Sequence, residues 1–238
     1  MQAMPELSLI IPAYNEAKNL PLFLERANQV LNVSGVEIVI VDNGSTDQSA
    51  AVLQELLPNY PFARSVRVEV NQGYGFGIVS GLRTAGSRYL GWTHADLQTD
   101  PGDVLRGLEL LRSAENQRVF VKGKRHGRPP ADQFFTAGMS VFETILMGTP
   151  MWDINAQPTL FSQAFFQTWK NPPQDFSLDL YAFYMARNQG LRIERFPVSF
   201  GQRAHGVSNW NVNWKSKVKF IRRTVDYSLK LRTELRDA

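Results

Sequence analysis

Two apolar segments, LSLIIPA at residues 7–13 and VEIVIVD at residues 36–42, decide the fold. Each is a continuous apolar run, which is typical of a strand buried on both faces of a sheet. Residues 17–32, between them, carry apolar side chains at helical spacing, including Leu20 and Leu24. A buried strand, a helix and a second buried strand form a right-handed βαβ unit, so these residues predict a parallel sheet.

The alternation of strand and helix continues to about residue 125. It predicts helices near 47–57, 75–86 and 102–113, and strands near 65–70, 88–92 and 118–122. Farther on, the pattern predicts a loop at 125–133, an apolar segment at 134–148, a helix at 175–190, a strand at 191–200 and a basic helix from Asn211. We therefore expect an α/β domain over residues 1–210, with a mostly parallel sheet flanked by helices, and a basic amphipathic C-terminal helix over residues 211–238.

The composition narrows the class of protein. Among the 238 residues there is no cysteine, which excludes disulfides, zinc–thiolate sites and cysteine nucleophiles. The first residues lack the basic and long apolar regions of a signal peptide, and no segment approaches the roughly 18 apolar residues of a membrane span. We therefore expect a cytoplasmic protein, either in solution or bound at the cytoplasmic face of a membrane.

The loops after the predicted strands are where a parallel α/β sheet binds ligands. Asp42 ends one strand, where its carboxylate can accept hydrogen bonds from a base or a ribose; a turn with a helix cap is the alternative explanation. The glycine-rich turn NQGYGFG, which contains Gly73, precedes a helix and can cradle a phosphate on backbone N–H groups. In WTHADLQTDP (92–101), His94 and Asp96 are two residues apart, so an extended chain points both the same way, as a metal site requires.

Four of these segments, taken in order, resemble the family 2 inverting glycosyltransferases, which have the Rossmann-like GT-A fold. The segments are IIPAYNE (10–16), IVIVDNGSTD (38–47), NQGYGFG (71–77) and GWTHADLQTDP (91–101). The resemblance covers about residues 7–210 and is strongest to the branch that transfers sugars to dolichyl or polyprenyl phosphate. That branch carries DADLQ-P where this chain reads HADLQTDP.

The resemblance implies a site for a nucleotide-diphosphate sugar and a divalent cation. By correspondence, the nucleotide-binding residues are Pro12, Tyr14, Glu16, Asp42, Gly73 and Asp96. The implied metal ligands are Asp96 and Gln98, with His94 in place of the family's first aspartate. Oxygen ligands suit Mn²⁺ or Mg²⁺, and the imidazole of His94 favours Mn²⁺. Two alternatives stay open: His94 contacts the diphosphate without binding metal, or the site is degenerate and the protein is inactive.

The second half of the chain is expected to bind the acceptor. Arg125, after the strand predicted at 118–122, corresponds to the family's arginine for the acceptor phosphate, with Arg128 close by. Arg203 and Ser208 match a family loop that closes over phosphate. Asp179 lies where many family members place a general base for a sugar hydroxyl, whereas a polyprenyl phosphate is already an anion and needs no base. The residues expected to act in catalysis are Asp96, Arg125 and Asp179.

These features predict an inverting hexosyltransferase that moves a hexose from a UDP- or GDP-sugar to a polyprenyl phosphate, as in cell-envelope biosynthesis. The alternatives are transfer to a sugar hydroxyl in polysaccharide or glycolipid assembly, a catalytically silent nucleotide-sugar-binding scaffold, and a dehydrogenase, against which the missing G-x-G-x-x-G after the first strand argues. The basic tail from Trp214 carries an apolar stripe that suits an anionic membrane surface; a packing helix with a solvated basic face is the alternative. Nucleic acid is not an expected partner, because the basic residues are not interleaved with a stacking surface.

Overall fold

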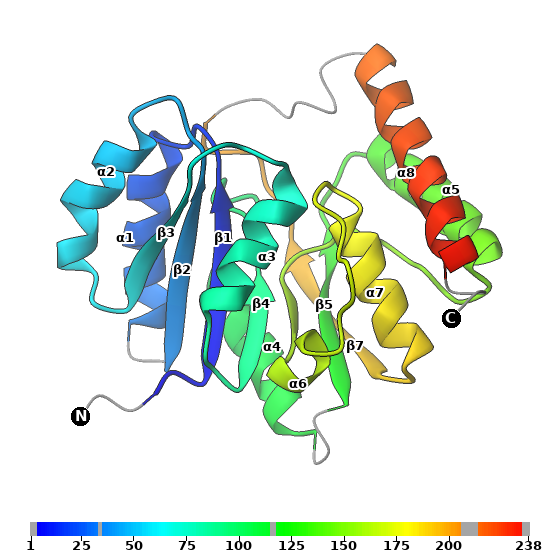
Figure 1. Ribbon diagram of the computed structural model, residues 1–238, viewed down its shortest axis with the longest axis horizontal. Coiled ribbons are helices and arrows are strands. Elements are labelled where there is room, and N and C mark those ends of the chain that lie inside the picture. Colours follow the sequence, from blue (N-terminus) through cyan, green and yellow to red (C-terminus); the bar gives the residue numbers. More distant parts are fainter. Residues whose placement is uncertain (1–3, 33–34, 115–117, 206–213, 235–238) are drawn as a thin grey trace.

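A seven-stranded sheet in the order β3-β2-β1-β4-β6-β5-β7 forms the centre of the protein (Figure 1). The structure is a computed structural model that describes residues 4–32, 35–114, 118–205 and 214–234. The strands are β1 (Leu7–Ala13), β2 (Val36–Asn43), β3 (Ala63–Val68), β4 (Tyr89–Trp92), β5 (Val119–His126), β6 (Thr159–Ser162) and β7 (Arg192–Ser199). All neighbouring strands are parallel except β6, which is antiparallel to both β4 and β5. The predicted α/β architecture with a mostly parallel sheet is therefore confirmed.

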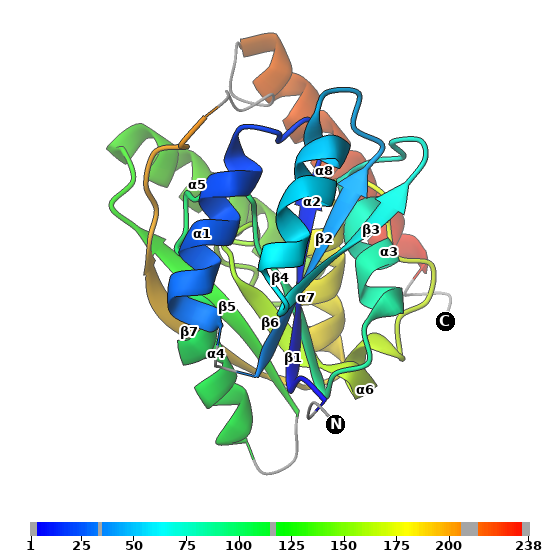
Figure 2. The ribbon, with the colours of Figure 1, turned by 90° about the vertical axis from the view of Figure 1, so that its left-hand side faces the viewer.

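Helices cover both faces of this sheet (Figure 2). They are α1 (Asn19–Leu31), α2 (Ser49–Leu56), a 3₁₀ turn (Leu57–Asn59), α3 (Tyr74–Thr84), α4 (Asp103–Arg112), α5 (Pro130–Met147), α6 (Gln163–Phe166), α7 (Leu178–Asn188) and α8 (Trp214–Glu234). Side chains of α1, α2 and α4 pack in one buried cluster, and side chains of α3, α6 and α7 pack in another on the opposite face.

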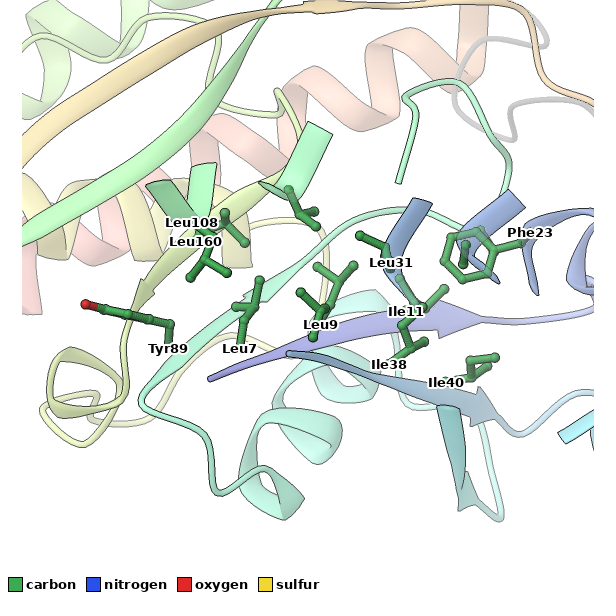
Figure 3. Close-up of a cluster of buried hydrophobic side chains, with 14 of the residues drawn as sticks. Leu7, Leu9, Ile11, Phe23, Leu31, Ile38, Ile40, Tyr89, Leu108 and Leu160 are labelled. Carbon is green, nitrogen blue, oxygen red and sulfur yellow. The ribbon is translucent and has the colours of Figure 1, made fainter. Parts of the chain in front are cut away.

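The continuous apolar runs are explained by this double covering. In β2, Ile38 and Ile40 belong to the first cluster, while Val39 and Val41 belong to the second, because successive side chains of a strand point to opposite faces. Figure 3 shows the first cluster, in which Phe23 of α1 lies near the carboxyl-end half of β1. The ends of these rigid strands hold the loops that form the site.

The structure corrects two expectations about the acceptor half. Strand β5 does not end at residue 122 but continues to His126, because β7 pairs with it along its whole length, from Val119 with Arg192 to His126 with Ser199. Arg125 therefore lies in a strand rather than in a loop after it. Helix α5 already begins at Pro130, so most of the loop expected over 125–133 is replaced by the ends of β5 and α5.

Helix α8 lies beside α5, away from the centre of the sheet (Figure 1). Ser228 of α8 donates a hydrogen bond to the buried carboxylate of Glu143 on α5, with its Oγ 2.8 Å from Glu143 Oε2. Burial raises the pKa of Glu143 to about 7. Among the helices that the structure describes, none has the length and apolar content to cross a membrane. The predicted residue Ser208 lies outside the described residues.

Candidate functional site

The loops after β1 and β2 are joined by hydrogen bonds at the carboxyl end of the sheet. Asn15, after β1, has a φ of 57° and accepts a hydrogen bond from the N–H of Thr46 at 2.8 Å. The backbone N–H of Glu16 donates to the hydroxyl of Ser49 at 2.9 Å. These bonds fix the loop after β1 against the loop after β2, so the two predicted nucleotide-binding segments lie together.

Asp42, predicted to bind the nucleotide, is almost completely buried at the end of β2. Its Oδ1 accepts the N–H of Ser45 at 3.0 Å, as the turn explanation requires. Its Oδ2 accepts a hydrogen bond from Nη1 of Arg67 at 2.6 Å. Arg67 was not expected at the site. The two residues are register partners in β2 and β3, a relation that appears only once the strand pairing is known.

The glycine-rich turn packs against a second loop. The N–H of Gly73 donates to Asn71 Oδ1 at 2.8 Å, and the N–H of Phe76 donates to Gln174 O at 2.9 Å. A methyl group placed on Gly75 would lie 2.4 Å from the carbonyl oxygen of Pro173, so only glycine permits this approach. Close packing thus accounts for the glycines, and the predicted role of Gly73 at a phosphate stays a prediction.

Asp96 occupies the centre of the site, after β4. Its Oδ1 accepts the N–H of Gln98 at 3.1 Å, and its Oδ2 lies 3.1 Å from Nη2 of Arg203. The His94 ring lies against Tyr74, with 5.8 Å between the ring centroids. Burial, opposed by the hydrogen bond from Asn19, raises the pKa of Glu16, and the nearby Asp96 charge raises it further.

The donors around Asp96 do not form a complete metal cage. Within the described residues, no three histidine or carboxylate side chains converge closely enough to hold a metal ion by themselves. Asp96 supplies a carboxylate, and His94 and Gln98 bring an imidazole and an amide to the same loop. A magnesium-type cation is commonly held by one or two carboxylates together with substrate phosphates, so this set fits a cation shared with a diphosphate.

Residues 201–205 close over this loop. Gly201 donates its N–H to Gln98 O at 2.8 Å, and Ala204 donates to Asp96 O at 3.2 Å. Nε of Arg203 is buried and has no hydrogen-bond partner. The structure thus brings the predicted Arg203 to Asp96, the predicted metal ligand.

Three arginines surround Asp153, between β5 and β6. Arg125 forms hydrogen bonds with its carboxylate, including one from Nε at 3.0 Å, while Arg128 and Arg195 lie 3.8 and 3.9 Å away. Although burial favours a higher value, the guanidinium of Arg125 holds the pKa of Asp153 below its usual range. Among these four side chains, positive charges outnumber negative charges by three to one. Arg195, on β7, was missed because only the pairing of β5 with β7 places it here.

Asp179, the predicted general base, is 2% exposed at the start of α7. Its Oδ1 accepts a hydrogen bond from Gln157 Nε2 at 2.8 Å and lies 3.7 Å from Nζ of Lys122. Lys122 is fully buried and donates to Thr159 Oγ1 at 2.7 Å. Burial lowers the pKa of Lys122 to about 8, although the charge of Asp179 opposes this. The buried ion pair was not expected, because residue 122 was placed at the end of a strand.

Tyr74 lies between Asp179 and the loop that carries His94 and Asp96. Its ring stacks on Phe176, with centroids 4.7 Å apart, and contacts His94 on another side. Burial, and then the negative charge of Asp179, raise the pKa of the phenol well above its ordinary value. The phenol therefore stays protonated at neutral pH and can donate a hydrogen bond.

Comparison with known proteins places these features in a family. Residues 8–179 match the model of glycosyl transferase family 2. A dolichol-phosphate mannosyltransferase from Pyrococcus furiosus is 30% identical over 121 residues, which are 50% of this chain and 34% of that protein. A dolichyl-phosphate beta-glucosyltransferase from Trichomonas vaginalis is 25% identical over 82% of this chain and 66% of its own length. The chain thus spans between about a third and two thirds of these relatives.

A solved structure shows the same fold. Glucosyl-3-phosphoglycerate synthase from Mycobacterium tuberculosis, in complex with Mn²⁺, UDP and glucosyl-3-phosphoglycerate, superposes with a TM-score of 0.73. It is 17% identical, and the match covers 96% of this chain and 80% of that one. The expected GT-A architecture is thereby confirmed.

Proposed function

Since the chain belongs to glycosyl transferase family 2 and is a glycosyltransferase, we propose that it transfers a hexose from a UDP- or GDP-sugar to a polyprenyl phosphate. In this reaction a phosphate oxygen of the acceptor attacks C1 of the hexose as the bond from C1 to the nucleoside diphosphate breaks. The configuration at C1 inverts, and the diphosphate departs with the bonding electrons. The relatives that are named for dolichyl-phosphate sugar transfer support this assignment.

The surroundings of Asp179 and of the three arginines near Asp153 indicate which kind of acceptor the enzyme uses. A general base must reach the proton that it removes. The Asp179 carboxylate is buried and is already engaged by Gln157 and Lys122. A phosphate nucleophile needs no base, and the three guanidinium groups around the single carboxylate of Asp153 leave a surplus of positive charge that favours a phosphate. This arrangement favours an anionic acceptor over a sugar hydroxyl.

On the donor side, Pro12, Tyr14, Glu16 and Asp42 would hold the nucleotide at the ends of β1 and β2. Asp96, with Gln98 and His94, would hold Mn²⁺ or Mg²⁺, and the imidazole favours Mn²⁺. When bound, the cation acts as a Lewis acid that offsets charge on the leaving diphosphate. The bound Mn²⁺ of the structural neighbour supports a divalent cation here. Arg203, whose Nη2 lies 3.1 Å from Asp96 Oδ2, would donate hydrogen bonds to the same diphosphate.

We also propose that the enzyme works at the cytoplasmic surface of a membrane, where its lipid acceptor resides. Helix α5 exposes three apolar side chains at positions that share one face: Phe134, Val141 and Ile145, of which Phe134 is 82% exposed and Ile145 is 76% exposed. Leu229 on the adjoining α8 is also half exposed. Exposed apolar residues grouped in this way suit insertion at a lipid interface.

A thermal-shift panel tests the donor half of the proposal. The full chain is heated with UDP, GDP, UDP-glucose and GDP-mannose, each with Mn²⁺, with Mg²⁺ or with EDTA. A ligand at about 100 times its dissociation constant adds about 2.7 kcal/mol to the free energy of unfolding, which corresponds to a shift of roughly 5–11 °C. The expected result is a shift with one nucleotide that requires a divalent cation. The absence of a shift with every nucleotide would contradict the proposal.

A further inference from the structure

We propose that Arg67, held in place by Asp42, binds the base of the donor nucleotide through its carbonyl oxygens and selects uracil or guanine over adenine. The inference rests on the proposed function and adds a residue that determines donor specificity. Asp42, the aspartate expected to bind the nucleotide, exposes little of its own surface.

Both oxygens of Asp42 are engaged within the protein. Oδ1 accepts the N–H of Ser45, and Oδ2 lies 2.6 Å from Nη1 of Arg67. The side chain of Asp42 is 3% exposed, whereas that of Arg67 is 45% exposed. A ligand that reaches this corner therefore meets the guanidinium first, with the carboxylate beneath it as an anchor.

Arg67 and Asp42 also lie at the edge of the sheet where ligands of this class of fold bind. Arg67 is near the end of β3, and ligands of open α/β sheets bind beyond the carboxyl ends of the strands. Tyr14 follows β1, which is separated from β3 by β2 alone, and it is 45% exposed at the same edge of the sheet. Arg64 makes a matching bond, 2.6 Å from Nε to Glu37 Oε1, but does so toward the opposite end of the same strands.

The charges at this corner favour a base over a phosphate. Arg67 is bonded to Asp42 and also lies 3.8 Å from Glu69, so two carboxylates face one guanidinium. The local surplus of negative charge repels a diphosphate. It does not prevent the remaining N–H groups of Arg67 from donating hydrogen bonds to a neutral ring.

A guanidinium is a donor only, so it selects ligands by their acceptors. Uracil offers two ring carbonyl oxygens. Guanine offers O6 beside N7, the pair that an arginine fork binds in nucleic-acid recognition. Adenine keeps the N7 acceptor but carries an amino group where guanine carries O6, so the arginine fork would lose one of its two hydrogen bonds and set a donor against a donor. Arg67 therefore distinguishes the bases by the presence of a carbonyl oxygen.

The test measures binding of UDP, GDP, ADP and inorganic pyrophosphate to the full chain in Mn²⁺ by calorimetry. The variants are Arg67→Gln, Arg67→Lys, which keeps the charge near Asp42, and the matched control Arg64→Gln. Wild type should prefer UDP or GDP to ADP. Both Arg67 variants should bind the preferred nucleotide about 10- to 100-fold more weakly, as expected for lost hydrogen bonds to a charged group, and should lose most of the discrimination against ADP. Pyrophosphate binding should not change, and Arg64→Gln should behave as wild type.

Three results of these binding measurements distinguish a failure of the Arg67 inference from a failure of the proposed function. Unchanged nucleotide affinity in folded Arg67 variants would overturn the inference and leave the proposed function intact. Equal losses for pyrophosphate and nucleotide would also overturn it, because Arg67 would then act on the phosphates or on the fold. If wild type bound no nucleotide at all, the proposed function itself would fail. Circular dichroism of each variant identifies any loss of binding that is due to misfolding.

Discussion

Substituting Gly75 by alanine tests whether the glycine-rich turn is a packing element. Gly75 is the second residue of α3, and its Cα faces the backbone of residues 173–175. An added methyl group would lie 2.4 Å from Pro173 O and 2.7 Å from Asp175 O. Both atoms belong to the backbone, so neither can rotate away as a side chain would. The loop that carries Phe176 must therefore move or the helix must shift.

Overpacking of this kind typically costs about 1–3 kcal/mol in the free energy of unfolding. In a chain of this size, each kcal/mol moves the melting temperature by roughly 2–4 °C, so Gly75→Ala should lower it by roughly 2–12 °C without ligand. Because the stacked pair of Tyr74 and Phe176 spans the same contact, kcat/KM should fall as well. Differential scanning calorimetry of the ligand-free protein gives the stability measurement.

Gly138→Ala is the matched control. Gly138 also lies in a helix, α5, but a methyl group added there would meet no atom within 4 Å. Alanine in a helix interior is favoured over glycine by about 0.5–1 kcal/mol, so this variant should melt slightly above wild type. If Gly75→Ala melted at or above the wild-type temperature while binding nucleotide more weakly, the packing account would be refuted and the phosphate cradle supported.

Three further predictions concern buried or paired charges. The folded-state pKa of Glu143, about 7, lies above the ordinary value of 4.5, so its contribution to stability is present below pH 4.5 and is lost as the pH rises through 7. Relative to wild type, Glu143→Gln should therefore gain about 3 kcal/mol between pH 4 and pH 8 in urea unfolding; a constant difference would contradict this. Arg203→Gln should bind Mn²⁺ alone more tightly, by electron paramagnetic resonance, because the variant removes the cation that now pairs with Asp96; unchanged or weaker binding would count against competition. Asp179→Asn should lower the free energy of unfolding by about 3–5 kcal/mol, because it leaves the Lys122 ammonium buried without a counter-charge. Adding Lys122→Met in the same chain should recover most of this loss, with kcat for a prenyl phosphate within about tenfold of wild type. A thousandfold loss of kcat in the folded double variant would instead support Asp179 as a general base.

The parts of the site that local sequence predicts are those formed by a single strand and the loop after it. The apolar runs before Pro12, Asp42 and His94 locate three strand ends, and strand ends converge in a parallel sheet. The strand β6 was missed, because four residues, Thr159–Ser162, give no periodicity and because an antiparallel strand breaks the βαβ alternation.

The residues that were missed depend on contacts between distant strands. Arg67 meets Asp42 through the register of β2 with β3, and Arg195 meets Asp153 through that of β5 with β7. Lys122 was placed in a basic stretch at a strand end, but the pairing of β5 with β7 continues past it and buries it. The local sequence of one strand does not predict which residue of another strand will pair with it.

The most direct test of the account is transfer of labelled hexose by the full chain in detergent with Mn²⁺. Radiolabelled UDP-glucose and GDP-mannose are supplied with undecaprenyl phosphate, with the same prenyl chain as its alcohol, or with a glycolipid that has free sugar hydroxyls. The account predicts label in the lipid phase only with the phosphate acceptor, and none when EDTA replaces Mn²⁺. Transfer to the glycolipid but not to undecaprenyl phosphate would contradict the anionic-acceptor mechanism that the buried Asp179 and the arginines around Asp153 support.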